Sequence, residues 1–120
     1  MYPIKDFMNS PVLSVDSQTS VEEADILMST KKVSSLPVKE SEEYVGIVTK
    51  SDFVKKIIAE DRDPKTTNIA SVMSKPLFSL DEYMQRSEAN EFMLKKKIKH
   101  LVVTQGKQVV GILTTKDMVG

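Results

Sequence analysis

The chain has 120 residues, of which 40% are hydrophobic and 28% are charged, enough for one packed domain or for two small halves that share a core. Lysine plus arginine equal aspartate plus glutamate at 17 against 17, and this zero net charge argues against a surface built to bind nucleic acid phosphates. Cysteine is absent, which excludes disulfides and thiolate metal sites. The first residues have no long apolar core and no run approaches the ~20 apolar residues that a membrane span needs, so we expect a soluble, cytoplasmic protein with no signal peptide and no membrane partner.

The first half of the chain predicts the element order β-α-β-β-α. A short strand is expected over residues 12–15, just after a proline. A Ser-x-x-Glu capping box followed by apolar residues at helical spacing predicts an amphipathic helix over 20–32. Short apolar runs predict strands at 36–38 and 44–49, and a second helix is expected to begin after Thr49.

The second half repeats the first at a distance of 65 residues. Residues 4–55 align with 69–120 without a gap, and about 18 of roughly 52 aligned pairs are identical, so the chain is a duplication. The alignment, together with a hairpin turn around Gly106, predicts a strand at 77–80, a helix at about 85–97 and strands at 101–103 and 109–114.

The duplication defines the expected domain organisation. Residues 1–60 form the first repeat, 61–68 a polar linker and 69–120 a second repeat whose last helix is cut short. One repeat of about 55 residues buries too little apolar surface to stand alone. We therefore expect an α/β (α+β) fold of two repeats packed sheet to sheet about a pseudo-twofold axis, with two equivalent clefts between them.

The motif Gly-Ile-Val-Thr-Lys-Ser-Asp at 46–52 returns as Gly-Ile-Leu-Thr-Thr-Lys-Asp at 111–117. A Thr followed three residues later by Asp is typical of a helix-starting capping box, which is a purely structural function. The same arrangement is also suited to a ligand, because a carboxylate can accept hydrogen bonds from two ribose hydroxyls and a helix start favours an anion. Capping and binding are compatible, so both interpretations stand.

Three features together resemble tandem CBS domains, also called a Bateman module, over about residues 3–120. They are the Gly-hydrophobic-hydrophobic-Thr-x-x-Asp ending, the Leu-Pro-Val strand at 36–38 and the Pro-x-x-Ser-hydrophobic opening of each repeat. The resemblance implies adenine-containing ligands, namely AMP, ADP, ATP or sometimes S-adenosylmethionine, although some CBS pairs bind nothing known. It also implies a homodimer that meets through helices, for which Phe53 and Met118 are the candidate exposed contacts.

The resemblance further implies two ligand sites, one around each aspartate. In the main site Asp117 would hold the ribose, Thr114 and Lys116 would lie near the phosphates, and residues of the first repeat would supply the adenine pocket. We expect this site to take the phosphorylated ligand, since Lys99 and His100 offer cationic donors where the first repeat has two serines. The main site comprises Ser14, Val33, Ser34, Ser35, Lys99, His100, Thr114, Lys116 and Asp117. The second site comprises Thr49, Ser51, Asp52, Ser79 and Ile98.

Other functions find less support in the sequence. Catalytic motifs and a glycine-rich phosphate loop are lacking and the single histidine has no metal-ligand companions, so we expect neither an enzyme nor a metal site nor a required cofactor. The sequence thus favours a regulatory module that senses an adenine nucleotide and couples its occupancy to an unidentified regulated protein. The alternative is a ligand-free module for dimerisation or protein interaction. A third interpretation, nucleic-acid binding through Lys95–Lys97 and Lys99, lacks the interleaved aromatic residues that such surfaces use.

Overall fold

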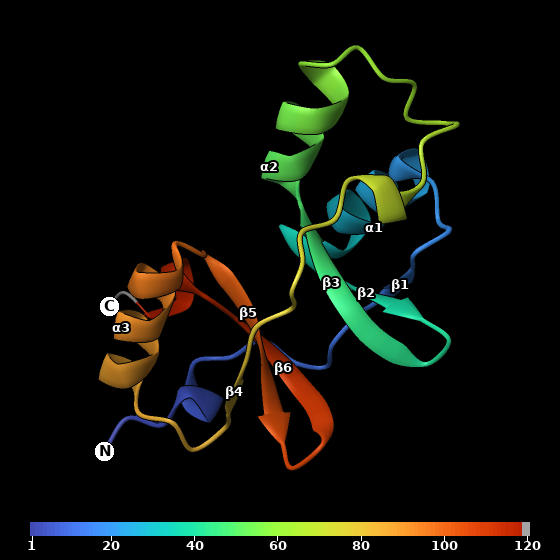
Figure 1. Ribbon diagram of the computed structural model, residues 1–120. Coiled ribbons are helices and arrows are strands. Elements are labelled where there is room, and N and C mark those ends of the chain that lie inside the picture. The colour runs from blue at the N-terminus through green and yellow to red at the C-terminus, as the bar shows by residue number, and fades with distance from the viewer. Residues whose placement is uncertain (119–120) are drawn as a thin grey trace. The chain divides into compact units, whose positions relative to one another are not determined.

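The computed structural model describes residues 1–118 and contains two three-stranded mixed sheets (Figure 1). The first has the order β1-β2-β3 and the second the order β4-β5-β6; in each, the first pair of strands is parallel and the second antiparallel. The strands are β1 (Val15–Asp16), β2 (Ser35–Glu40), β3 (Glu43–Thr49), β4 (Ser79–Asp81), β5 (His100–Gln105) and β6 (Gln108–Thr114). The predicted α/β class with two β-α-β-β-α repeats is confirmed.

The helices follow the same repeat. They are η1 (Ile4–Asp6), α1 (Val21–Lys31), α2 (Lys50–Phe53) continued by the π-helical η2 (Val54–Ile58), η3 (Ile69–Ser71), α3 (Arg86–Lys96) and η4 (Thr115–Met118). Within residues 1–118, no helix is long and apolar enough to cross a membrane. The shortened last helix predicted for the second repeat corresponds to η4 as far as Met118, and residues 119–120 lie outside the described residues.

The helix predictions agree with the structure to within about one residue at each end. Ser20 caps α1, because its hydroxyl oxygen accepts a hydrogen bond from the backbone N–H of Glu23 at 3.1 Å. The strand prediction for 12–15 is wrong in its bounds, since β1 begins only at Val15. The ladder to β2 holds only the pairs Val15–Val38 and Asp16–Lys39, so the residues before Val15 have no partner in it.

The chain forms two compact units that do not coincide with its two repeats. Unit 1 consists of Met1–Val12 together with the chain from Phe78 onward, and unit 2 of Leu13–Leu77. Residues 4–11 and 69–76, which we call the leading segments, therefore each pack in the unit that holds the strands and helices of the other repeat. The linker 61–68 belongs to unit 2, where Thr67 and Pro64 accept hydrogen bonds from the first turn of α1.

Each unit has its own hydrophobic core, formed by helices and strands of one repeat and by the leading segment of the other. The core of unit 2 comprises Val15, Val21, Ala24, Met28, Leu36, Val38, Val48, Phe53, Ile57, Ile69, Val72 and Met73. That of unit 1 comprises Ile4, Ala89, Met93, Leu101, Val103, Leu113 and Met118. Phe53 and Met118 are only 7% and 8% exposed, so the prediction that they are surface contacts is wrong: the residue after each capping aspartate points into the core.

Candidate functional site

The repeated Thr-x-x-Asp motif forms a reciprocal capping box in both units. In unit 2 the Asp52 backbone N–H donates to Thr49 Oγ1 at 3.2 Å, while Asp52 Oδ2 accepts from the backbone N–H and the hydroxyl of Thr49 at 2.9 and 3.1 Å. In unit 1 the equivalent distances between Thr114 and Asp117 are 3.2, 3.1 and 2.9 Å. The structural interpretation of the motif is therefore confirmed, and a ligand function has to be compatible with it.

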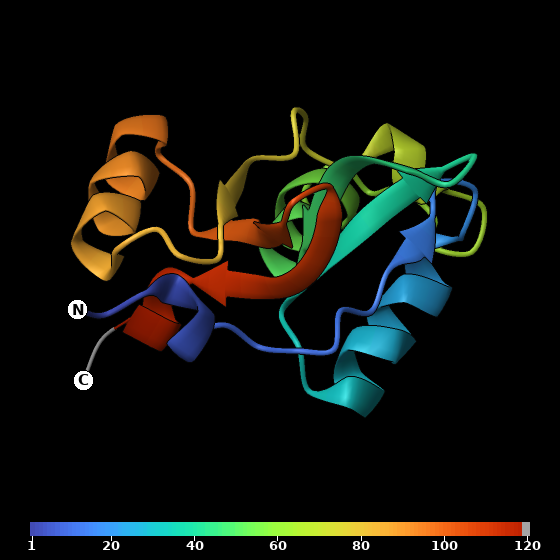
Figure 2. The same ribbon diagram turned by 90° about the horizontal axis from the view of Figure 1, so that it is seen from below.

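Each capping aspartate also binds the leading segment of the other repeat. Asn9 Nδ2 donates to Asp117 Oδ2 at 2.8 Å, and the Ser74 hydroxyl donates to Asp52 Oδ1 at 3.4 Å. Asn9 and Ser74 are equivalent residues of the duplication. The backbone of each also exchanges two hydrogen bonds with the adjacent strand, Asn9 with Ile112 and Ser74 with Ile47. Figure 2 shows the N-terminal segment running alongside β6.

The motif glycines make room for these segments. A Cβ added at Gly46 would lie 2.8 Å from the carbonyl oxygen of Ser74, and one added at Gly111 would overlap the side chain of Met8. Real Cβ atoms essentially never approach other heavy atoms so closely. The spacing from glycine to aspartate thus has a structural cause in both repeats: the glycine admits the leading segment and the aspartate holds it.

Unit 1 brings together the charged half of the predicted main site. His100 at the start of β5 lies directly opposite Thr114 at the end of β6, and the carbonyl of Lys99 accepts a hydrogen bond from the backbone N–H of Thr115 at 3.1 Å. Asp117 follows within one turn and is half-buried, while Lys116 is exposed. Three cationic or potentially cationic side chains (Lys99, His100 and Lys116), the hydroxyl of Thr114 and the carboxylate of Asp117 therefore belong to the same end of the β5–β6 hairpin.

Unit 2 brings together the equivalent residues of the first repeat. Ser35 lies opposite Thr49, and the Ser34 carbonyl accepts from the backbone N–H of Lys50 at 3.2 Å. Ser51 at the start of α2 is exposed, and Asp52 is 8% exposed.

The other predicted members flank the first strands and the starts of the hairpins. Ser14, just before β1, and Val33, just before β2, lie in unit 2, whereas Ser79 in β4 and Ile98 before β5 lie in unit 1. Each predicted site thus takes residues from both units, and that pairing stays a prediction.

The two aspartates differ in their surroundings. At Asp52 both carboxylate oxygens have partners, since Oδ1 lies 3.5 Å from the ammonium of Lys56 in addition to its bond with Ser74. At Asp117 the hydrogen bonds within residues 1–118 all fall on Oδ2, and no described residue forms an ion pair with the carboxylate. The Asp117 side chain is therefore the one with an oxygen left to accept a hydrogen bond from a ligand.

The sequence reasoning missed three residues that contact the aspartates. Asn9 and Ser74 stand between a methionine and a proline that are identical in both repeats, so the internal alignment carried a signal for them. Lys56 follows Asp52 at the i,i+4 spacing at which helical side chains meet, a signal that was also available.

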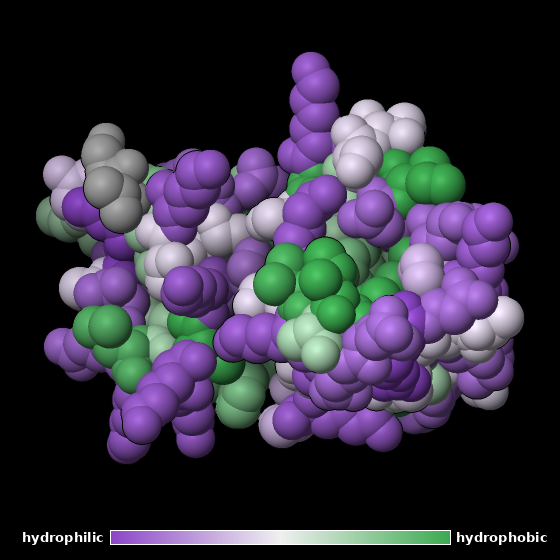
Figure 3. All heavy atoms as spheres, turned by 90° about the horizontal axis from the view of Figure 1, so that it is seen from above, coloured by the Kyte–Doolittle hydropathy of each residue, from purple (hydrophilic) through white to green (hydrophobic). Residues whose placement is uncertain are grey.

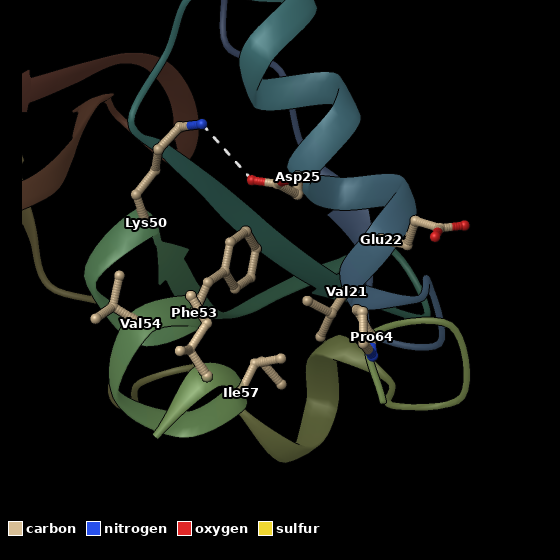
Figure 4. A pocket seen from close by; sticks show the side chains of 9 residues that line it. Val21, Glu22, Asp25, Lys50, Phe53, Val54, Ile57 and Pro64 are labelled. Atoms are coloured by element: carbon tan, nitrogen blue, oxygen red, sulfur yellow. Dashed lines mark ion pairs between the residues drawn. The ribbon is translucent and has the colours of Figure 1, made fainter. Parts of the chain in front are cut away.

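A groove lies elsewhere, between α1 and the helix α2–η2 of unit 2 (Figure 4). Its volume is about 370 Å³. Phe53 and Ile57 face α1 across it, and Lys50 and Asp25 form an ion pair of 3.6 Å at its rim. None of the predicted site residues lines this groove.

Comparison with known proteins places this geometry in a family. The sequence model of the CBS domain family matches residues 4–59 and again residues 69–120. The chain belongs to the CBS domain family and carries two such domains in tandem, the arrangement of a Bateman module.

Relatives and solved structures agree with this assignment. The CBS domain-containing protein YhcV of Bacillus subtilis is 30% identical over 118 residues, which cover 98% of this chain and 84% of YhcV. The hexameric CBS-CP12 protein from bloom-forming cyanobacteria has a TM-score of 0.92 at 28% identity, covering 98% of this chain and 69% of that one. The CBS domain pair of protein MJ0100, solved with 5′-methylthioadenosine and S-adenosyl-L-methionine, has a TM-score of 0.85 over 97% of this chain and 91% of its own. Its identity of 24% shows a shared fold alone.

Proposed function

We propose that this CBS pair, a regulatory module, binds an adenine nucleotide at the Asp117 end of the β5–β6 hairpin and signals its occupancy to a partner. The observation that carries the proposal is the grouping of Lys99, His100, Thr114 and Asp117 at that end. The carboxylate retains an oxygen that can accept hydrogen bonds from ribose hydroxyls. The lysine and the histidine can supply the charge-assisted donors that a phosphate requires.

The chemical class of the ligand follows from these groups. An adenosine moiety is common to AMP, ADP, ATP and S-adenosylmethionine, and the MJ0100 domain pair was solved with two adenosine compounds bound. Cationic donors favour the phosphorylated members of the class. We therefore place AMP, ADP and ATP ahead of S-adenosylmethionine as ligands of this chain.

The proposed mechanism is linkage between ligand and partner. In this proposal the adenine is held by Ser14 and by residues 33–35 of unit 2, while the ribose and phosphates are held in unit 1. A ligand that engages both units favours the arrangement that it fits best. A regulated protein that recognises the same arrangement is then coupled to the nucleotide concentration.

A second candidate function, self-association or docking without a ligand, is favoured by one observation. Val54 and Ile58 on η2 are 57% and 73% exposed beside the groove of unit 2. Figure 3 shows apolar atoms gathered among polar ones on the face seen from above, where α2 stands in Figure 1. We propose this helix as the contact of a homodimer, and the relative CBS-CP12 is a hexamer.

Thermal melts with AMP, ADP, ATP and S-adenosylmethionine test the proposed function. A ligand that binds only the folded protein, present at 100 times its Kd, should add about 2.7 kcal/mol of stability, a shift of several degrees. Lys99→Ala should reduce the shift with ATP, because it removes a phosphate donor.

Lys107→Ala is the matched control. This lysine is also exposed but lies at the opposite end of the same hairpin, so its removal should leave the shift unchanged. If none of the four compounds shifts the melt of the wild-type protein, ligand-free self-association becomes the leading function.

A further inference from the structure

Lys56 lies where it neutralises the aspartate of the first repeat. Its ammonium is 3.5 Å from Asp52 Oδ1 and donates a hydrogen bond of 2.7 Å to the carbonyl oxygen of Val72. The two ionic side chains are only 35% and 11% exposed. Lys56 therefore joins the helix that follows the capping box to the leading segment of the second repeat, with both of its acceptors on unit 2.

The acceptors of the Asp52 carboxylate are used up by the protein itself. Oδ2 serves the capping box of Thr49, and Oδ1 faces Lys56 and the hydroxyl of Ser74. Asp117, the equivalent residue, makes its capping box and its bond to Asn9 through one oxygen and has no ion pair with any residue of 1–118. Equivalent positions of the duplication thus hold one internally satisfied carboxylate and one with a free acceptor.

We infer that Lys56 is a specificity-determining residue that closes the first-repeat site, so that each chain binds one adenosine ligand rather than two. The inference rests on the proposed function and deepens it. A ribose that approached Asp52 would have to displace both Lys56 and Ser74 from Oδ1. The displaced ammonium would remain partly buried without its counter-ion, an unfavourable state that opposes binding.

In the opposite function, Lys56 would donate a hydrogen bond to a ligand phosphate and so help the first-repeat site to bind a nucleotide. The geometry argues against it, since the ammonium is already directed to a carboxylate and a carbonyl oxygen at 3.5 and 2.7 Å. Removing the charge of Lys56 distinguishes the two functions. If Lys56 closes the first-repeat site, the removal should allow a ligand to bind there; if Lys56 is a phosphate donor, the removal should weaken binding there.

Isothermal titration calorimetry provides the test, with AMP and the uncharged 5′-methylthioadenosine as probes. The second compound has the adenine and the ribose diol without a phosphate, so its binding does not depend on phosphate donors. Wild-type protein should bind one equivalent per chain, and Lys56→Met should bind two equivalents of 5′-methylthioadenosine. Lys55→Met, which alters an exposed neighbour on the same helix, should still bind one.

Two further variants keep the test decisive. Lys56→Gln removes the charge but retains an N–H donor for Val72, so it should bind two equivalents even if Lys56→Met folds poorly. Asp117→Ala in the otherwise wild-type chain removes both acceptor oxygens and should abolish binding, because the Asp52 site is closed.

The outcomes separate this inference from the proposed function. Two equivalents in the wild type, one equivalent in a folded Lys56→Gln, or residual binding in a folded Asp117→Ala would overturn the inference while leaving an adenosine-binding protein. Absence of binding in every variant would refute the proposed function, and the inference with it.

Discussion

The side-chain amide of Asn9 donates a 2.8 Å hydrogen bond to the carboxylate of Asp117, which stands 108 positions later in the chain. The bond joins the segment that leads into the first repeat to the capping box that ends the second. Ser74 and Asp52 form the equivalent contact in unit 2. The repeated motif is consequently a device that anchors each leading segment as well as a candidate ligand site.

Asn9→Ala should destabilise the protein by about 1 kcal/mol, which is typical of one lost hydrogen bond. Urea unfolding measures the loss. In a double-mutant cycle with Asp117→Ala, the two changes should be less than additive, because both remove the same contact. Strictly additive losses would show that the bond contributes nothing to stability.

Gly111→Ala should destabilise the protein by about 1–3 kcal/mol, the usual effect of overpacking a filled site. The three heavy atoms nearest to an added Cβ at Gly111 all belong to the Met8 side chain. Met8→Ala should therefore recover part of the loss when it is combined with Gly111→Ala.

Gly46→Ala supplies the contrast for that rescue. Here the nearest atom is the backbone carbonyl oxygen of Ser74, which a side-chain truncation cannot move. Adding Met73→Ala to Gly46→Ala should not restore stability. Urea unfolding of the two glycine variants, each with and without its methionine truncation, measures the rescue. A gain in stability at both positions, or at neither, would contradict the proposed packing of the leading segments.

Glu82→Gln should stabilise the folded protein by about 1 kcal/mol at neutral pH. Glu82 is 6% exposed and its Oε2 has no hydrogen-bond partner among residues 1–118, whereas the equivalent residue of the first repeat is the small Ser17. The substitution to glutamine removes the unfavourable free energy of burying a charged carboxylate. Thermal unfolding should show a higher Tm for Glu82→Gln and little change for the control Glu42→Gln, which removes an exposed charge in the turn between β2 and β3.

Ile58→Lys should weaken self-association if η2 forms the dimer contact. Ile58 is 73% exposed and adjoins the apolar groove, so a charge there opposes burial against a second copy without disturbing the core. Sedimentation velocity should show a shift toward monomer. Ile26→Lys, at 59% exposure on α1 and outside the residues that line the groove, is the control that should leave the oligomer unchanged.

Much of the fold follows from local patterns in the sequence. The helices α1 and α3 are marked by apolar spacing and, for α1, by the Ser20 cap. The hairpin β5–β6 is marked by the turn at Gly106, whose φ of 61° lies in the left-handed region that glycine adopts most readily. The duplication then transfers each assignment from one half of the chain to the other.

The division into units was not predictable in this way, because it depends on contacts between residues far apart in the sequence. Nothing local in residues 4–11 indicates that they pack against β6 rather than with the strands of their own repeat. The burial of Phe53 and Met118 follows from the same packing, since each contributes to a core completed by a leading segment. The i,i+4 spacing suggests that Lys56 and Asp52 meet, but only the structure shows that Val72 fixes the lysine there.

A titration of ¹⁵N-labelled protein with AMP, followed by amide chemical shifts, tests whether the nucleotide binds at the Asp117 end of the β5–β6 hairpin. Binding at the Asp117 end of the hairpin predicts the largest changes at Lys99, His100 and residues 114–117, with smaller changes at Ser14 and residues 33–35. The amide chemical shifts of Val54 and Ile58 should not change. Changes confined to the groove of unit 2, or no changes at saturating AMP, would contradict the proposed site.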